Sequence, residues 1–147
     1  MRILVIGGTG LLGGYLLRRL IQKKCHIDLI TRNPANLTVV SDDIHPIVID
    51  IAKKDWLHPS ELCLADYDVI YHLAYATSGD EAYDRAVTVD SVCVLNNALR
   101  ELADDRERHF IYVGSMVVFG ANPDDRTVTE ASPKRGDTLY AKQKIAA

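Results

Sequence analysis

The feature that most constrains this chain is the glycine-rich segment GGTGLLG at residues 7–13, which directly follows an apolar run at residues 2–6. Leucines at helical spacing come next, so the sequence predicts a strand, a tight turn and a helix in succession. Gly7 permits the turn, Gly10 lets the backbone approach a pyrophosphate, and Gly13 permits close packing of the helix on the strand. The helix N-terminus adds unpaired N–H groups and a positive dipole end. We therefore expect a dinucleotide-binding turn, which also includes Thr9, Leu11 and Leu12.

Short apolar runs and amphipathic segments alternate along the rest of the chain. Strands are expected at residues 2–6, 26–31, 46–49, 68–72 and 110–113, helices at residues 11–23, 80–103 and 139–147, and a short helix with a loop at residues 53–64. This alternation indicates an α/β fold in which a parallel sheet is covered on both faces. Right-handed crossovers then give a doubly wound sheet of strand order 3-2-1-4-5, with its ligand crevice at the carboxyl ends of the first and fourth strands.

Residues after the second and third strands have the chemistry to hold the adenosine half of a dinucleotide. Arg32 follows the second strand, and a guanidinium there pairs with the 2′-phosphate of NADP, whereas a carboxylate would accept from the 2′-hydroxyl of NAD. No carboxylate follows until Asp42, which favours NADP over NAD. Asp50 follows the third strand, where it either accepts from the adenine amino group, with the backbone amide of Ile51 reading the ring, or simply caps the strand.

Tyr140 and Lys144 are candidate catalytic residues because their spacing places both on one face of the last predicted helix. A neighbouring ammonium stabilises a phenolate and lowers the pKa of the tyrosine, which can then act as general acid and base near neutral pH. Ser115, at the end of the fifth strand, faces the same crevice and can bind the same substrate oxygen. The alternative for Tyr140 is an aromatic at the helix start that packs on the loop around Pro133.

Composition is that of an ordinary globular protein. Of the 147 residues, 48% are hydrophobic and 25% charged, and the net charge of −3 with dispersed basic residues argues against nucleic-acid binding. No apolar run approaches the ~18 residues of a membrane span. No cysteine and histidine residues have zinc spacing, so we expect no metal. The cysteines are interpreted as buried thiols of a reduced, cytoplasmic protein, and they are Cys25, Cys63 and Cys93.

Five segments, in order, resemble the extended short-chain dehydrogenase/reductases, the NAD-dependent epimerase/dehydratase group. Residues 7–13 are similar to the TGxxGxxG turn of that family, and residues 50–51 to its adenine-binding element. DVIYHLA at residues 68–74 resembles its fourth strand, SMVVFG at residues 115–120 its SxxxVYG segment, and YAKQK at residues 140–144 its YxxxK motif. The resemblance covers essentially the whole chain and implies a Rossmann-like domain with NADP or NAD as cofactor.

The resemblance also implies residue roles. The tyrosine of the YxxxK motif is the catalytic base, the lysine tunes it and holds the nicotinamide ribose, and the serine orients the substrate oxygen; these roles pass to Tyr140, Lys144 and Ser115. Tyr75 stands where the family has an alanine and adds bulk beside the cofactor, and Asp90 stands where the family has an asparagine. The implied cofactor contacts of these segments are Leu73, Ala74, Tyr75, Asp90, Tyr140 and Lys144.

Family members are longer than this chain, so residues 1–147 are expected to form an NAD(P)-binding domain truncated before the substrate domain, as an excised domain or a truncated product. The leading function is the cofactor-binding half of an epimerase or oxidoreductase that acts on a nucleotide-sugar or a similar hydroxyl or carbonyl substrate. The absence of an acidic pair after Ser115 argues against a dehydratase. The alternatives are an NADPH-dependent carbonyl reductase and a non-catalytic dinucleotide-sensing module. Alone, the fragment is expected to be inactive, and its exposed apolar surface predicts a homodimer.

Overall fold

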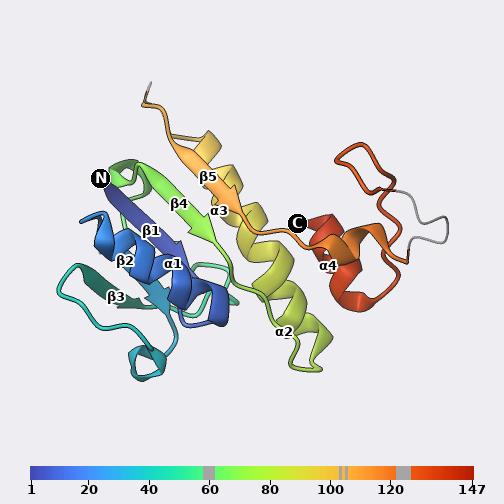
Figure 1. The fold of residues 1–147 in the computed structure, drawn as a ribbon, viewed down its shortest axis with the longest axis horizontal. Helices are drawn as coiled ribbons and strands as arrows, with labels where there is room; N and C mark the ends of the chain where they lie inside the picture. Colours follow the sequence, from blue (N-terminus) through green and yellow to red (C-terminus); the bar gives the residue numbers. More distant parts are fainter. Residues whose placement is uncertain (58–61, 103, 105, 122–126) are drawn as a thin grey trace.

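Five parallel strands form one sheet in the order β3-β2-β1-β4-β5 in a computed structural model of the chain (Figure 1). The structure describes residues 1–57, 62–102, 104, 106–121 and 127–147. The strand order confirms the predicted doubly wound sheet, and it reverses between β1 and β4. The strands are β1 (Arg2–Ile6), β2 (His26–Thr31), β3 (Ile44–Val48), β4 (Val69–His72) and β5 (His109–Tyr112).

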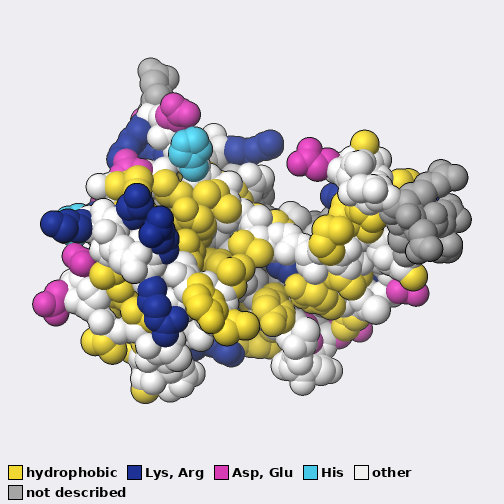
Figure 2. Space-filling view, in the orientation of Figure 1, with side chains coloured by type: hydrophobic (Ala, Val, Ile, Leu, Met, Phe, Trp, Pro, Cys, Tyr) yellow, Lys and Arg dark blue, Asp and Glu magenta, His cyan; other side chains and the backbone are white. Residues whose placement is uncertain are grey.

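Helices cover both faces of the sheet. α1 (Leu11–Gln22) packs on one face, and the other face carries the helical stretch of α2 (Glu81–Arg85), the π-helical segment η3 (Ala86–Asp90) and α3 (Ser91–Arg100). The carboxyl-terminal helix α4 (Leu139–Ala146) lies beyond the β5 edge (Figure 1) and packs against η3 and the short segment η4 (Met116–Phe119). Figure 2 shows Lys and Arg side chains over α1, on the side of that helix that faces solvent. Two further short turns are η1 (Pro34–Asn36) and η2 (Leu64–Asp66).

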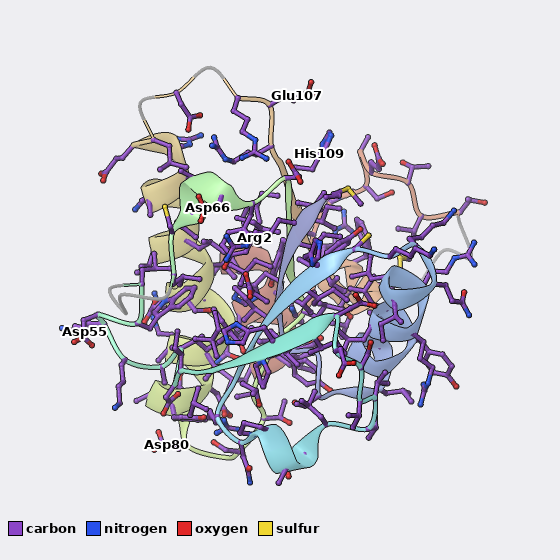
Figure 3. All side chains as sticks on the ribbon, turned by 90° about the vertical axis from the view of Figure 1, so that its left-hand side faces the viewer. Arg2, Asp55, Asp66, Asp80, Glu107 and His109 are labelled. Carbon is purple, nitrogen blue, oxygen red and sulfur yellow. The ribbon has the colours of Figure 1, made fainter. Side chains whose placement is uncertain are left out.

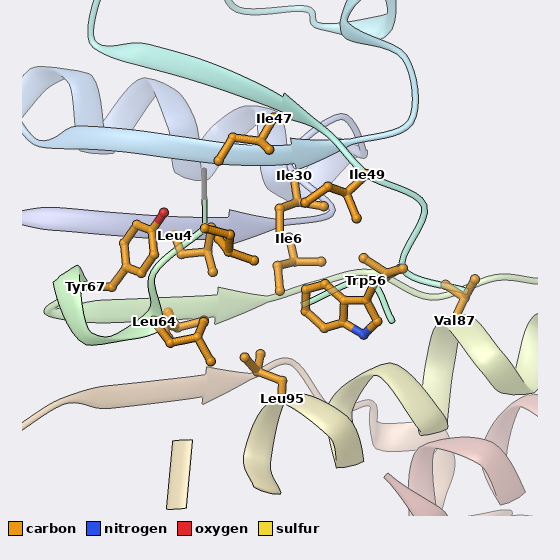
Figure 4. Packing of buried hydrophobic residues seen from close by; sticks show 13 residues of the cluster. Leu4, Ile6, Ile30, Ile47, Ile49, Trp56, Leu64, Tyr67, Val87 and Leu95 are labelled. Carbon is orange, nitrogen blue, oxygen red and sulfur yellow. The ribbon is translucent and has the colours of Figure 1, made fainter. Parts of the chain in front are cut away.

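The central strand is buried on both sides, which explains its unbroken apolar sequence. Because successive side chains of a strand point to opposite faces, Ile3 and Val5 pack in the layer of α1, whereas Leu4 and Ile6 pack in the layer of α3 with Leu95 (Figure 4). Each large apolar side chain buried in this way contributes about 1.5–3 kcal/mol. The two layers fix β1, and therefore the glycine turn that follows it, in the middle of the fold.

The predicted helix at residues 80–103 is a single helical stretch with a change of winding in it. Asp80 caps its start by accepting from the backbone N–H of Tyr83 at 3.1 Å. The α-helical winding widens to a π-helix at Ala86–Asp90 and returns to an α-helix at Ser91, whose hydroxyl donates to the carbonyl of Val87 at 2.6 Å. α3 ends at Arg100, three residues before the predicted end, and residue 103 lies outside the described residues.

Three expectations need correction. No α-helix forms at residues 53–57, which make turns, and residues 58–61 of the predicted helix and loop lie outside the described part. β3 begins at Ile44 rather than Pro46, because an edge strand tolerates the missing N–H of Pro46. Of the cysteines only Cys25 is buried, while Cys63 and Cys93 are exposed. Apolar sequence neighbours do not bury a residue that lies on the solvent side of its own helix or turn.

Asp28 of β2 holds together the strands toward their amino ends. Its carboxylate accepts from Arg2 Nε at 3.0 Å and from the Tyr67 hydroxyl at 2.9 Å, and it lies 3.0 Å from Nδ1 of His45. Arg2 also donates to Asp66 at 2.9 Å, and Figure 3 shows these two side chains together. Burial, followed by the hydrogen bond to Asp28, raises the pKa of Tyr67 well above its ordinary value. The Asp28 carboxylate therefore lies inside a ring of hydrogen-bond partners that come from or near three other strands.

Candidate functional site

A cleft of about 400 Å³ lies at the carboxyl ends of β1 to β4, where the strand order reverses. It is the place that the topology of a doubly wound sheet provides for a ligand. Nine of the residues predicted to bind a cofactor line this cleft, and they are Gly7, Thr9, Gly10, Arg32, Asp50, Ile51, Leu73, Ala74 and Tyr75. The lining also includes residues that the sequence did not single out, among them Asn33, Asn36, Ala76, Thr77 and Tyr83.

The glycine turn forms the floor of the cleft, and its glycines differ in what they tolerate. Gly7 has a φ of +89°, and a Cβ there would lie 2.5 Å from the backbone nitrogen of Ala74. A Cβ on Gly13 would lie 2.5 Å from the Cα of Gly8, so Gly13 allows α1 to start close to the turn. At Gly10, the N-cap of α1, a Cβ would meet only the carbonyl of Gly7 at 3.6 Å. The space above Gly10 is therefore open to a ligand.

Leu11 and Leu12 are the first two residues of α1, and both side chains are exposed and outside the cleft lining. Their contribution to the site is the unpaired backbone N–H groups at the start of the helix. No acidic residue occupies the first turn of α1, so the helix dipole faces the cleft unopposed. An open N-cap glycine beside free N–H groups is a fitting place for a pyrophosphate.

Arg32 reaches across the cleft to Tyr83. The guanidinium Nη1 donates to the hydroxyl of Tyr83, and the guanidinium carbon lies 5.7 Å from the centre of the tyrosine ring. Arg32 comes from the end of β2 and Tyr83 from α2, so the pair spans the cleft from one layer to the next. Asp50, which follows β3, is partly buried. Its Oδ1 accepts from the N–H of Ala52 at 3.1 Å, which holds the carboxylate at the edge of the cleft.

Lys144 gathers three tyrosines around its ammonium; Tyr75, Tyr112 and Tyr140 are called the tyrosine cluster below. Nζ of Lys144 is 4.4 Å from the ring centre of Tyr112, 5.9 Å from that of Tyr75 and 6.0 Å from that of Tyr140. The rings of Tyr75 and Tyr140 have centroids 5.5 Å apart. Aromatic faces attract a cation at these distances. Because Tyr75 also lines the cleft, the cluster adjoins it directly.

Burial changes the pKa values of Lys144, of Tyr112 and of His72, whose ring lies 6.0 Å from that of Tyr112. It lowers the pKa of Lys144 from 10.5 to about 8 and raises that of Tyr112 to about 12. Burial, with a smaller contribution from the charge of Lys144, lowers the pKa of His72 to about 4. Nε2 of His72 lies 2.9 Å from the hydroxyl of Ser91, which already donates to a backbone carbonyl, so the imidazole is neutral with its proton on Nε2.

The remaining predicted residues, Ser115, Tyr140, Lys144 and Asp90, lie outside the lining of the cleft. Ser115 follows β5 and caps η4, with its Oγ accepting from the N–H of Val117 at 3.4 Å. Tyr140 and Lys144 share one face of α4, as their spacing predicts, and neither lines the cleft itself. Asp90 is exposed, lies outside the cleft lining and has Oδ1 3.5 Å from Nε of Arg85.

Within the described ranges, no group of three or more His, Cys, Asp and Glu side chains is arranged to hold a metal ion. In the same residues, no helix has both the length and the apolar character needed to cross a membrane.

Solved structures share this fold. The chain has a TM-score of 0.79 and 20% identity to a short-chain dehydrogenase/reductase superfamily protein from Agrobacterium tumefaciens with bound NAD. The match covers 99% of this chain and 42% of that protein. It has a TM-score of 0.77 and 22% identity to WbmG of Bordetella bronchiseptica in complex with NAD and UDP, and that match covers 99% of this chain and 47% of WbmG. The chain thus spans less than half the length of these structures.

Sequence comparison gives the family. An epimerase family protein of Staphylococcus epidermidis is 32% identical over 78 residues, which are 52% of this chain and 23% of the relative. The family model of the NAD dependent epimerase/dehydratase family matches residues 3–147. Together with the sheet order and the glycine turn, this match over nearly the whole chain places the protein in the NAD dependent epimerase/dehydratase family.

Proposed function

We propose that this chain is the cofactor-binding and acid–base half of an NADP- or NAD-dependent epimerase or oxidoreductase, with NADP preferred. One observation carries the proposal: Tyr75 lines the cleft and also contacts Tyr140, so that the cleft and the candidate catalytic pair adjoin. A dinucleotide in the cleft would supply a hydride acceptor or donor at this point of contact. The family match and the NAD-bound structures of similar fold support a nicotinamide cofactor.

The residues of the cleft fit such a cofactor. The N-terminus of α1 and the open side of Gly10 would receive the pyrophosphate. Asp50 and the backbone of Ile51 would receive the adenine, and Arg32 would pair with a 2′-phosphate. The two solved structures described above hold NAD, so the preference for NADP is a proposal about this chain alone, and it stands on Arg32 in the cleft and on the absence of a carboxylate between Arg32 and Asp42.

Tyr140 would take and return the proton of a substrate hydroxyl or carbonyl. The amine of Lys144, one helical turn away and 6.0 Å from the ring centre of Tyr140, would support this proton transfer. Ser115, at the carboxyl end of β5, would bind the same oxygen once its weak 3.4 Å bond to Val117 gives way. General acid–base catalysis of this kind contributes about 10²- to 10⁴-fold to a rate.

The substrate proposed is a nucleotide-sugar or a similar hydroxyl or carbonyl compound, in line with the UDP held by WbmG. A second candidate, an NADPH-dependent carbonyl reductase, is favoured by the position of Arg32 in the cleft. The sensing module stays as an alternative, against which the shared face of Tyr140 and Lys144 argues. We also propose that the protein is cytoplasmic and forms a homodimer. The exposed apolar side chains of Leu11, Leu12 and Tyr15, near the start of α1, support the self-association.

The test is a titration of the chain with NADPH, followed by nucleotide fluorescence, for the wild type and Gly10→Val. Because a Cβ on Gly10 meets only one atom, at 3.6 Å, the variant should keep the wild-type melting temperature. Its side chain would fill the space that the pyrophosphate needs, so binding should be lost. Gly10→Ala should give an intermediate loss. Wild-type affinity in a folded Gly10→Val variant would contradict the proposed site.

A further inference from the structure

The contact between Arg32 and Tyr83 places a phenol hydroxyl beside the guanidinium that faces the cleft. Nη1 of Arg32 donates to this hydroxyl, and the guanidinium also lies over the ring at 5.7 Å. Both side chains line the cleft. The two residues are 51 positions apart in the sequence and come from different layers of the fold, so only the folded chain brings them together.

Both ends of the contact are held by local backbone structure. The backbone around Arg32 is fixed because the hydroxyl of Thr31 donates to the carbonyl of Asn33 and accepts from its N–H, each at 3.2 Å. The N–H of Tyr83 donates to the carboxylate of Asp80 at 3.1 Å, at the cap of α2. The contact is therefore a preformed feature of the cleft. Because Arg32 and Tyr83 are already ordered by it, a ligand that binds there loses less free energy to the ordering of side chains.

Arg32 brings a positive charge to this contact. Two charged residues line the cleft, Arg32 and Asp50. The carboxylate of Asp50 accepts a hydrogen bond from the backbone N–H of Ala52. A guanidinium has five N–H donors in a planar fork, so one bond to Tyr83 leaves four for a phosphate. A hydroxyl that accepts from Arg32 still has its own proton to donate. Together, Arg32 and Tyr83 thus offer a phosphate more hydrogen-bond donors than either residue alone.

We propose that Tyr83 is a second specificity-determining residue for the 2′-phosphate of NADP, a proposal that rests on the proposed cofactor site. Its hydroxyl holds the guanidinium of Arg32 in place and donates its own proton to a phosphate oxygen. NAD lacks that phosphate and gains nothing from either contact. Tyr83 therefore raises the affinity for NADP and leaves that for NAD as it is.

The test is calorimetric titration of the 147-residue chain with NADP⁺, NAD⁺ and the fragment 2′,5′-ADP. Tyr83→Phe keeps the ring and removes the hydroxyl, so it should weaken NADP⁺ and 2′,5′-ADP about tenfold or more, the scale of a hydrogen bond to a charged group, and leave NAD⁺ within about twofold. Tyr15→Phe is the matched control, because Tyr15 is exposed on α1 and lies outside the cleft lining. It should change neither affinity.

Arg32→Ala completes the design. If Tyr83 acts partly through Arg32, the double variant should lose less NADP⁺ affinity than the two single losses multiplied together. A Tyr83→Phe variant that binds NADP⁺ as the wild type does, or that weakens NADP⁺ and NAD⁺ equally, overturns this inference and leaves the proposed function standing. A wild type that binds neither dinucleotide overturns the proposed function, and one that binds both equally overturns the preference for NADP with the role of Tyr83.

Discussion

Lys144 donates a hydrogen bond of 2.9 Å from Nζ to the backbone carbonyl of Val113. This bond joins α4 to the residue that follows β5, and it turns the ammonium inward, toward the ring of Tyr112 at 4.4 Å. The side chain of Lys144 is thereby buried beside Tyr140 rather than extended into solvent. A backbone carbonyl and an aromatic face stabilise the charged amine only in part, because neither carries a full negative charge.

The first prediction concerns the burial of Lys144. The pKa of Lys144 is about 8 in the folded chain and 10.5 for an ordinary exposed lysine, so between these pH values the unfolded chain holds a proton that the folded chain has released. The free energy of unfolding therefore rises with pH in that interval. We expect the stability of the wild type relative to Lys144→Met to increase between pH 8 and 9.5 in urea unfolding. An equal difference at both pH values would show a hydrated amine.

The second prediction concerns His72, whose pKa of about 4 lies below the ordinary value of 6.5 because of burial and the charge of Lys144. Below pH 6.5 the unfolded chain takes up a proton that the folded chain refuses, so stability should fall as the pH falls toward 4. In NMR titration the imidazole of His72 should keep the shifts of its neutral, Nε2-protonated form from pH 8 to pH 5. His72→Gln would assign the resonance. A midpoint near pH 6.5 would contradict this placement.

The order of the sheet could be predicted from sequence because it depends on local patterns. The apolar run of β1 and the glycine turn at residues 7–13 fix one strand–helix unit, and right-handed crossovers leave few ways to add the others. The shared face of Tyr140 and Lys144 likewise follows from a spacing of four residues. These features need no knowledge of how distant segments meet.

The contact between Arg32 and Tyr83 could not be predicted in this way. It depends on how α2 is seated over the cleft, and no spacing in the sequence relates residue 83 to residue 32. The inward turn of Lys144 toward Val113 has the same origin, because helical spacing fixes the face of a residue and not the partner of its amine. The widened turn at Ala86–Asp90 also carries no pattern in its residue types.

The third prediction tests what holds the strands together. Asp28 accepts from Arg2 and from Tyr67 while its own side chain is almost fully buried. Asp28→Asn keeps the shape and removes the charge, and hydrogen bonds to charged groups contribute about 1.5–3 kcal/mol. We expect a loss of about that size in the free energy of unfolding, measured in urea. Asp42→Asn, at an exposed position outside this network, serves as the control and should lie within about 0.5 kcal/mol of the wild type.

The last prediction concerns the chemistry at Tyr140 in the complete protein. If Tyr140 moves the proton of the substrate, Tyr140→Phe should lower kcat by about 10²-fold or more, because the ring stays and only the acid–base group is lost. Cofactor affinity should persist, since the ring still packs against Tyr75 at the edge of the cleft. Lys144→Ala should lower both kcat and cofactor affinity, because that amine both supports Tyr140 and lies beside the cleft residue Tyr75. Tyr15→Phe should change neither quantity. Turnover of Tyr140→Phe within a few-fold of the wild type would leave Tyr140 as a packing residue of the tyrosine cluster and remove the acid–base role from this helix.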